Sequence, residues 1–273
     1  MFLPDAIPSK LPVVGWPNGK TACLAYNRGM SAVENETSSL LVVIATFNER
    51  QSLPLLVDEL LKLLPTCDIH VVDDNSPDGT GAWCDQRASE EDRLTVSHRT
   101  GKLGLGSATK LGLRHGIAGG YQFIATMDAD LSHDAKSLQE MYLKYCHMSA
   151  EPSAVVIGSR YVKGGQIIGW PWYRRLSSWG VNAFARFALR LRTRDNTSAF
   201  RIYPVVVLEQ IDLDDISSQG YSYLEEILVL LRKSNVRMEE YPITFRNREV
   251  GQSKVDISEM VRSLWQILRL AFR

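Results

Sequence analysis

Short apolar runs that alternate with polar or glycine-rich segments are the feature that most constrains how this chain can fold. Five mainly aliphatic runs have the length of strands, and they occupy residues 40–45, 69–73, 93–97, 121–127 and 154–158. Residues 52–64 and 107–120 lie between such runs and repeat apolar side chains at helical spacing. Repeated strand–helix–strand units form a mostly parallel sheet with helices on both faces. The chain is therefore predicted to adopt an α/β fold.

A polar segment follows each of the five apolar runs. These segments read TFNE, DDNSPDGT, RTGKLGLG, DADLSH and GSRYVKGG. In an open parallel sheet, ligands bind in the crevice at the carboxyl ends of the strands. The five segments are therefore expected to converge on one rim, and this convergence is the strongest functional signal that the residues themselves provide.

Composition narrows the class of function. The 31 Lys and Arg residues balance 31 Asp and Glu residues, so net charge predicts no nucleic-acid partner. The four cysteines are far apart and form no CxxC, which predicts neither a disulfide framework nor a zinc site and favours a reducing, cytoplasmic compartment. No apolar run approaches the roughly 18 to 20 residues of a spanning helix, and the first residues lack a secretory pattern.

The chain is predicted to have three parts. Residues 1–38 combine Pro, Gly and Ser without periodicity, which is typical of a loosely ordered arm. Residues 39–254 carry the strand and helix pattern of one large domain. Residues 255–273 place apolar side chains at i, i+3, i+4 and i+7 and arginines on the other side, which predicts an amphipathic helix.

The segment TMDADLSHD sets two carboxylates, Asp128 and Asp130, one residue apart at the end of a predicted strand. Two such carboxylates can share a hard divalent cation, and Mg²⁺ commonly completes its octahedral shell with phosphate oxygens. A DxD alone also occurs in many surface turns, which is the structural alternative. Its position after a buried strand favours a metal-bound diphosphate. His133 is expected to form a hydrogen bond near the metal, since no second His is nearby to complete a ligand pair.

Seven motifs in order make the chain resemble the dolichol-phosphate mannose synthases, polyprenyl-phosphate glycosyltransferases of family 2 with the GT-A fold. The motifs are ATFNE, VVDDNSPDGT, RTGKLGLGSA, MDADLSHD, GSRYVKGG, DNTSAFR and FRNREVGQSK. The similarity runs from about Leu40 to the C-terminus. The resemblance implies a Rossmann-like nucleotide-binding half. It also implies inverting transfer of mannose from GDP-mannose to a polyprenyl (dolichyl-type) monophosphate, with Mg²⁺ or Mn²⁺ as cofactor.

The resemblance also implies which residues form the site. Those implied for the donor nucleotide sugar are Ala45, Phe47, Glu49, Val72, Asp74, Asp128, Ala129, Asp130, Arg160, Arg248 and Lys254. Asp128 and Asp130 would bind the metal, with Asp130 as the chief ligand, and Arg248 would join them as a catalytic residue. The residues implied for the acceptor phosphate are Arg160, Arg174, Arg175 and Ser178.

The chemistry agrees with this set of residues. Transfer from a nucleoside diphosphate requires stabilisation of the charge that builds on the leaving group, which metals and arginines provide. A phosphate monoester has a second pKa of about 6 and is already an anionic nucleophile at neutral pH. No general base is therefore assigned.

Two positions depart from the family pattern. Ala45 stands where the first motif normally begins with Pro, and Ala199 stands where the family has Gly, which permits a positive φ. Alanine at position 199 is expected to alter a backbone turn near the acceptor. Two alternatives stay open: the same fold with UDP-glucose or UDP-N-acetylglucosamine as donor, and a nucleotide-sugar-binding protein without turnover.

A polyprenyl phosphate resides in a bilayer, so the protein is expected to be peripheral on the cytoplasmic face of a membrane or to use a membrane-anchoring partner. Residues 170–192 interleave Trp and Arg, and together with the C-terminal helix they are candidates for contact with the membrane surface. The structural alternative is that both helices pack on the sheet.

Overall fold

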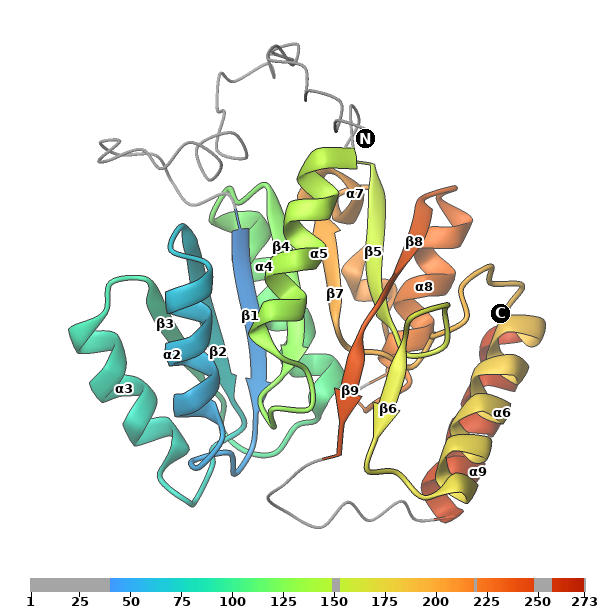
Figure 1. Ribbon diagram of the computed structural model, residues 1–273, viewed down its shortest axis with the longest axis horizontal. Coiled ribbons are helices and arrows are strands. Elements are labelled where there is room, and N and C mark those ends of the chain that lie inside the picture. Colours follow the sequence, from blue (N-terminus) through green and yellow to red (C-terminus); the bar gives the residue numbers. More distant parts are fainter. Residues whose placement is uncertain (1–39, 149–152, 219, 248–256, 273) are drawn as a thin grey trace, which may run out of the picture. The chain divides into compact units, whose positions relative to one another are not determined.

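A seven-stranded sheet forms the centre of the fold (Figure 1). The computed structural model describes residues 40–148, 153–218, 220–247 and 257–272. The sheet has the order β3-β2-β1-β4-β7-β5-β8. Its strands are β1 (Leu40–Thr46), β2 (Cys67–Asp73), β3 (Leu94–His98), β4 (Phe123–Asp128), β5 (Ala154–Ser159), β7 (Arg201–Pro204) and β8 (Arg237–Pro242). A separate parallel pair consists of β6 (Gln166–Ile168) and β9 (Thr244–Arg246).

Strand direction confirms the predicted, mostly parallel sheet. Strands β1 to β4 pair in parallel, and β7 is antiparallel to both β4 and β5. β5 therefore runs in the same direction as β4, and β8 is parallel to β5. The carboxyl ends of β1 to β5 consequently meet at one edge of the sheet, as the polar segments predicted. The order 3-2-1-4 of the first four strands is that of a Rossmann half.

Helices cover both faces of the sheet (Figure 1). They are α2 (Leu53–Leu63), α3 (Thr80–Glu90), α4 (Leu105–Ala118), α5 (Ala135–Met148), α6 (Trp172–Ala188), α7 (Val205–Leu208), α8 (Tyr223–Lys233) and α9 (Ile257–Ala271), with a 3₁₀ turn at Leu213–Asp215. α2 packs on α5 on one face, whereas α4 packs on β1, β2 and β4 on the other. The two helices predicted between strands are α2 and α4.

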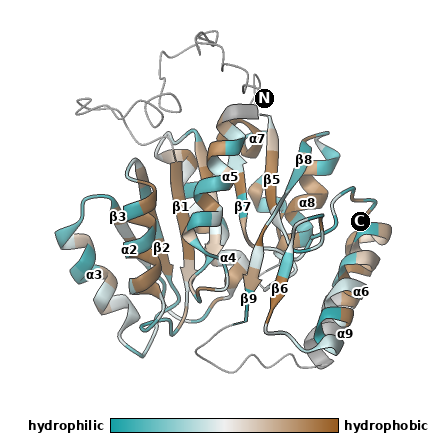
Figure 2. Cartoon of the chain, viewed as in Figure 1, coloured by the Kyte–Doolittle hydropathy of each residue, from teal (hydrophilic) through white to brown (hydrophobic). Residues whose placement is uncertain are grey.

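The central strand and α4 approach each other very closely. Leu40–Ile44 of β1 are buried, which explains their unbroken apolar sequence and the hydrophobic colour of β1 in Figure 2. A Cβ at Gly112 would lie 2.2 Å from Val43 Cγ1, and one at Gly116 would lie 2.5 Å from Ile124 Cδ1. A larger residue at either α4 position would collide with these side chains, so the two glycines let the helix pack directly against β1 and β4.

The C-terminal part adds a pair of helices, α6 and α9, that lie side by side (Figure 1). No helix within the described ranges is long and apolar enough to cross a bilayer. Among the described residues, Cys67 and Cys84 are buried free thiols.

A buried histidine makes stability depend on pH. His70 of β2 is hydrogen-bonded to Thr95 and Ser97, and it stacks on His115 with ring centroids 3.8 Å apart. Burial, reinforced by His115, lowers the pKa of His70 from 6.5 to about 4. Between these values the unfolded chain binds the extra proton, so His70 contributes stability that is lost as pH falls.

We therefore expect the free energy of unfolding to fall less steeply from pH 7 to pH 5 in His70→Gln than in the wild type, measured by urea denaturation. His98→Gln is the matched control, because the Asp85 carboxylate raises the pKa of His98 and its removal should steepen the loss. Equal pH slopes in all three proteins would contradict the assignment.

Candidate functional site

The carboxyl ends of β1, β2 and β4 lie in register. Ala45 of β1 pairs with Val72 of β2 on one side and with Asp128 of β4 on the other. These three residues come from separate motifs, and all three were predicted for the donor. Parallel pairing fixes the backbones of neighbouring strands relative to each other, so the residues form one row across the rim.

The loops after β1 and β2 are joined by hydrogen bonds. The Glu49 amide donates to Thr80 Oγ1 at 3.1 Å, and the Arg50 amide donates to Asp78 Oδ2 at 3.0 Å. The Glu49 carboxylate in turn accepts a hydrogen bond from the Ser52 hydroxyl at 2.5 Å at the start of α2. The structure thus brings the predicted Glu49 to the same rim as the row formed by β1, β2 and β4.

The loop after β3 is attached to the same edge. The buried Asp74 carboxylate pairs with Arg99 and accepts a hydrogen bond from the Gly104 amide at 3.0 Å. Lys102, in the same loop, places its ammonium 4.4 Å from the ring centroid of Phe47. Asp74 and Phe47 therefore hold the glycine-rich loop beside the row, in addition to the donor role predicted for both.

The two carboxylates of the DxD segment differ in exposure. Asp128 ends β4 with its side chain 26% exposed, whereas Ala129 and Asp130 are buried. Asp130 Oδ1 accepts a hydrogen bond from the Ser132 amide at 3.0 Å, which holds the turn after the strand. Carboxylate oxygens are the ligands that Mg²⁺ prefers, and Mg²⁺ is usually bound through one or two of them. The chemistry of this pair therefore fits a divalent cation.

His133 packs beside the carboxylates as a neutral ring. Its Nδ1 lies 3.9 Å from Asp128 Oδ2, beyond hydrogen-bond distance, and has no hydrogen-bond partner among the described residues. The ring stacks on Phe200 at 4.8 Å and meets the edge of Phe245 at 5.3 Å. Burial holds the pKa of His133 well below its usual range. The described residues thus give His133 Nδ1 no hydrogen bond, and aromatic packing fixes the ring.

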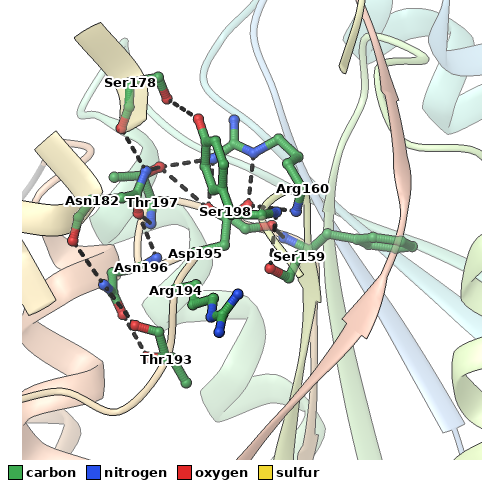
Figure 3. Close-up of polar contacts among 12 residues, drawn as sticks. Ser159, Arg160, Ser178, Asn182, Thr193, Arg194, Asp195, Asn196, Thr197 and Ser198 are labelled. Carbon is green, nitrogen blue, oxygen red and sulfur yellow. Dashed lines mark hydrogen bonds and ion pairs between the residues drawn. The ribbon is translucent and has the colours of Figure 1, made fainter. Parts of the chain in front are cut away.

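A buried ion pair stands at the end of β5. Arg160 donates from Nε and Nη2 to the two oxygens of Asp195 at 2.7 and 2.6 Å, and its amide also donates to Asp195 (Figure 3). Arg160 Nη2 reaches Thr197 Oγ1 at 2.8 Å. Burial alone lowers the pKa of Arg160, but Asp195 more than offsets this and keeps the guanidinium charged. Two nitrogens of the predicted phosphate-binding Arg160 are therefore already bound.

The predicted acceptor residues gather around this pair. Ser178 Oγ accepts a hydrogen bond from the Tyr161 hydroxyl at 2.7 Å. The guanidinium of Arg174 lies 4.1 Å from the Trp170 ring centroid, and that of Arg160 lies 5.7 Å from the same centroid. One indole thus lies close to both arginines, and the first turns of α6 are brought to the end of β5.

Among the described residues, one predicted acceptor residue stands apart from this cluster. Arg175 is exposed and donates to the Ile167 carbonyl at 2.8 Å, so it braces β6. Arg248 and Lys254 lie outside the described residues, and their predicted roles stay predictions.

The motif that contains Ala199 is a rigid buried element. Arg201 is fully buried and donates to the carbonyls of Asn196 and Leu224, both at 2.9 Å. The Ala199 carbonyl accepts a hydrogen bond from Thr126 Oγ1 at 2.6 Å. Ala199 does not have a positive φ. Alanine therefore fits here without the altered turn that its departure from Gly had suggested.

Sequence reasoning assigned no role to Asp195 or Glu240. Glu240 of β8 accepts hydrogen bonds from the amides of Arg194 and Asp195, both at 2.9 Å, and so holds Asp195 toward Arg160. The signal for Asp195 was its place at the head of the DNTSAFR motif. Glu240 lies in a strand with no motif, so only the structure finds it.

A Rossmann-like sheet whose fourth strand ends in Asp-Ala-Asp at the ligand-binding rim is the architecture of a GT-A glycosyltransferase. The sequence profile of Glycosyl transferase family 2 matches residues 41–212, and the chain belongs to this family.

Curated relatives share most of their length with this chain. It is 41% identical over 216 residues to an undecaprenyl-phosphate mannosyltransferase of Micrococcus luteus, covering 79% of this chain and 87% of that protein. It is 39% identical over 243 residues to a polyprenol monophosphomannose synthase of Mycolicibacterium smegmatis, covering 89% and 90%. Glucosyl-3-phosphoglycerate synthase from Mycobacterium tuberculosis, solved with Mn²⁺, UDP and phosphoglyceric acid, has the same fold, with a TM-score of 0.61 and 16% identity over 86% of this chain and 78% of that one.

Asp195→Asn is expected to lower the free energy of unfolding by about 3–5 kcal/mol, because it leaves the buried Arg160 guanidinium without its counter-ion. Urea denaturation measures this loss. Asp58→Asn is the matched control: its exposed pair with Arg87 should contribute less than about 1 kcal/mol. Similar losses in the two variants would show that the Arg160–Asp195 pair is not a structural requirement.

Proposed function

We propose that this chain transfers mannose from GDP-mannose to a polyprenyl monophosphate at a membrane surface, with a divalent cation bound by Asp128 and Asp130. The observation that carries the proposal is the row of Ala45, Val72 and Asp128, which places a carboxylate pair beside a Rossmann crevice. Two relatives near 40% identity carry polyprenol mannosyltransferase names, which supports this donor sugar and this acceptor.

The donor would lie along the rim. Its nucleoside would contact Ala45, Phe47 and Val72, and its diphosphate would point toward Asp128 and Asp130. When bound there, Mg²⁺ or Mn²⁺ supplies electrostatic stabilisation to the diphosphate as it departs. A structural neighbour with the same fold was solved with Mn²⁺ and UDP, which supports a metal beside a nucleotide in this fold.

The acceptor phosphate would approach from the side of α6. An oxygen of the lipid phosphate forms a bond to the anomeric carbon of mannose while the bond from that carbon to the GDP oxygen breaks, and GDP leaves with the electron pair. The phosphate is anionic at neutral pH, so the step requires no protein base. Arg174 and Ser178 would hold this phosphate, and their contacts with Trp170 and Tyr161 support this role. Asp195 fixes the Arg160 guanidinium at the end of β5.

Exposed apolar side chains on α6 and α9 support contact with the bilayer. Trp172, Leu176 and Trp179 recur on α6 at i, i+4 and i+7 and are each more than half exposed. Trp265 of α9 and Phe272, directly after that helix, are also more than half exposed. These exposed apolar side chains support contact with a membrane interface.

Asp130→Asn is expected to lower kcat/KM for mannosyl-lipid formation roughly 10²- to 10³-fold, the loss typical of removing one electrostatic stabiliser of a transition state. The assay uses radiolabelled GDP-mannose, a short polyprenyl phosphate and Mg²⁺ or Mn²⁺. Asp134→Asn is the matched control in the same segment, because Asp134 accepts from the Ser137 amide at the start of α5. It should keep activity near the wild-type level.

Full activity of Asp130→Asn would contradict the site, and wild-type transfer from UDP-glucose or UDP-N-acetylglucosamine in place of GDP-mannose would contradict the donor. Absence of any transfer, with tight nucleotide-sugar binding, would favour a binding protein without turnover.

Combined Trp172→Ser and Leu176→Ser substitutions are expected to weaken vesicle binding roughly 10-fold or more, since each removes a large apolar side chain that the bilayer would bury. Flotation with phosphatidylcholine vesicles that contain phosphatidylglycerol measures the bound fraction. Leu55→Ser with Val206→Ser is the control, because both side chains are exposed on helices away from α6. Equal flotation of the two double variants would contradict contact between α6 and the membrane.

A further inference from the structure

A hollow outside the predicted donor and acceptor residues lies along the C-terminal half of α6. Its volume is about 960 Å³, which is at the upper end of the range for small-molecule pockets. Arg186, Arg190 and Arg194 line it together with the aromatic rings of Trp179 and Phe187. Neither the seven motifs nor the proposed reaction uses these three arginines.

The three guanidinium groups form a local excess of positive charge. All three side chains are exposed, and within the described residues none of them makes an ion pair with an acidic side chain. Figure 3 shows the Arg194 guanidinium without a hydrogen bond to the neighbouring polar cluster. The formal net charge of the whole chain is zero, so this concentration is a property of the hollow and not of the surface in general.

The end of α6 opposes anion binding only weakly. The helix ends at Ala188, and Arg190 turns the chain with a φ of 52°. A helix C-terminus carries roughly half a negative charge. Three full positive charges from the arginines outweigh that partial charge, so the hollow attracts anions. Planar guanidinium groups suit phosphate oxygens in particular, because they donate in pairs.

The aromatic side chains that line the hollow indicate the source of the anion. Trp179 and Phe187 are 58% and 86% exposed, and they continue the apolar stripe of Trp172 and Leu176 along α6. Aromatic rings beside cations are typical of segments that lie in the headgroup layer of a bilayer. A soluble phosphate would use the arginines but would leave these rings in water. The hollow therefore suits a phosphate that is attached to a membrane.

We infer that this hollow binds the phosphate headgroup of an anionic membrane phospholipid, at a site separate from the acceptor phosphate. The inference rests on the proposed function, because it assumes that the protein takes its acceptor from a membrane. Tyr161 stands between the two sites: it lines the hollow, and its hydroxyl donates to Ser178 of the acceptor cluster. Headgroup binding thus fixes α6 on the bilayer with the acceptor residues beside the surface.

The test compares the full-length wild type with a triple variant, Arg186→Gln, Arg190→Gln and Arg194→Gln. Flotation is measured with pure phosphatidylcholine vesicles and with vesicles that also contain phosphatidylglycerol. Each arginine near an anionic surface strengthens binding about fivefold, so the loss of all three should weaken binding to the anionic vesicles roughly 100-fold. Binding to the neutral vesicles should stay unchanged. The matched control removes three exposed cations elsewhere: Lys62→Gln, Lys136→Gln and Arg237→Gln. It should keep most of the anionic binding.

Equal losses in the two triple variants would overturn the inference, because overall charge would then explain the attraction. If millimolar glycerol phosphate in solution released the wild type from anionic vesicles, the hollow would bind a phosphate that is not part of a bilayer. That result would overturn a membrane lipid as the source of the anion. Mannosyl transfer in detergent without phospholipid should be the same in the arginine variant and the wild type. Failure of the proposed function would appear instead as no transfer by the wild type itself.

Discussion

Parallel pairing of β1 with β2 and β4 is the constraint on which the rest of the site depends. It aligns Ala45 between Val72 and Asp128, so backbone register sets both the position proposed for the nucleoside and the carboxylate proposed for the metal. Glycines on α4 let that helix press directly on β1 and β4, and the loops after β1 and β2 are joined by hydrogen bonds to each other. The edge proposed for the donor is thus held together by strand pairing and by hydrogen bonds between its loops.

The acceptor half is organised differently, around buried charge. Arg160 and Asp195 neutralise each other inside the fold, and Glu240 holds the backbone that carries Asp195. Such a pair is a weak source of net stability but a strong constraint on geometry, since either charge alone would be costly to bury. Through Tyr161, Thr197 and Trp170 the pair is connected to the first turns of α6. The surface proposed to meet the membrane is in this way connected to the proposed acceptor site.

The five apolar runs predicted β1 to β5 to within two residues, because strands in the interior of a sheet are mostly apolar along their length. The convergence of five polar segments on one edge followed from strand direction alone. Asp195 had one signal in the sequence, its place at the head of the DNTSAFR motif. Glu240 was beyond reach, since its importance lies in contacts between β8 and a loop, which no local pattern records. The neutral packing of His133 between Phe200 and Phe245 was missed for the same reason. Conversely, the departure at Ala199 looked consequential in sequence and is not, because its φ is not positive.

Anomalous diffraction from crystals grown with GDP-mannose and Mn²⁺ tests the central claim most directly. The account predicts a manganese peak within bonding distance of the Asp130 carboxylate and close to that of Asp128, bridged to the diphosphate, with guanosine against Ala45 and Val72. A peak elsewhere, with both carboxylates turned to solvent and the nucleotide away from the ends of β1 and β4, would contradict it.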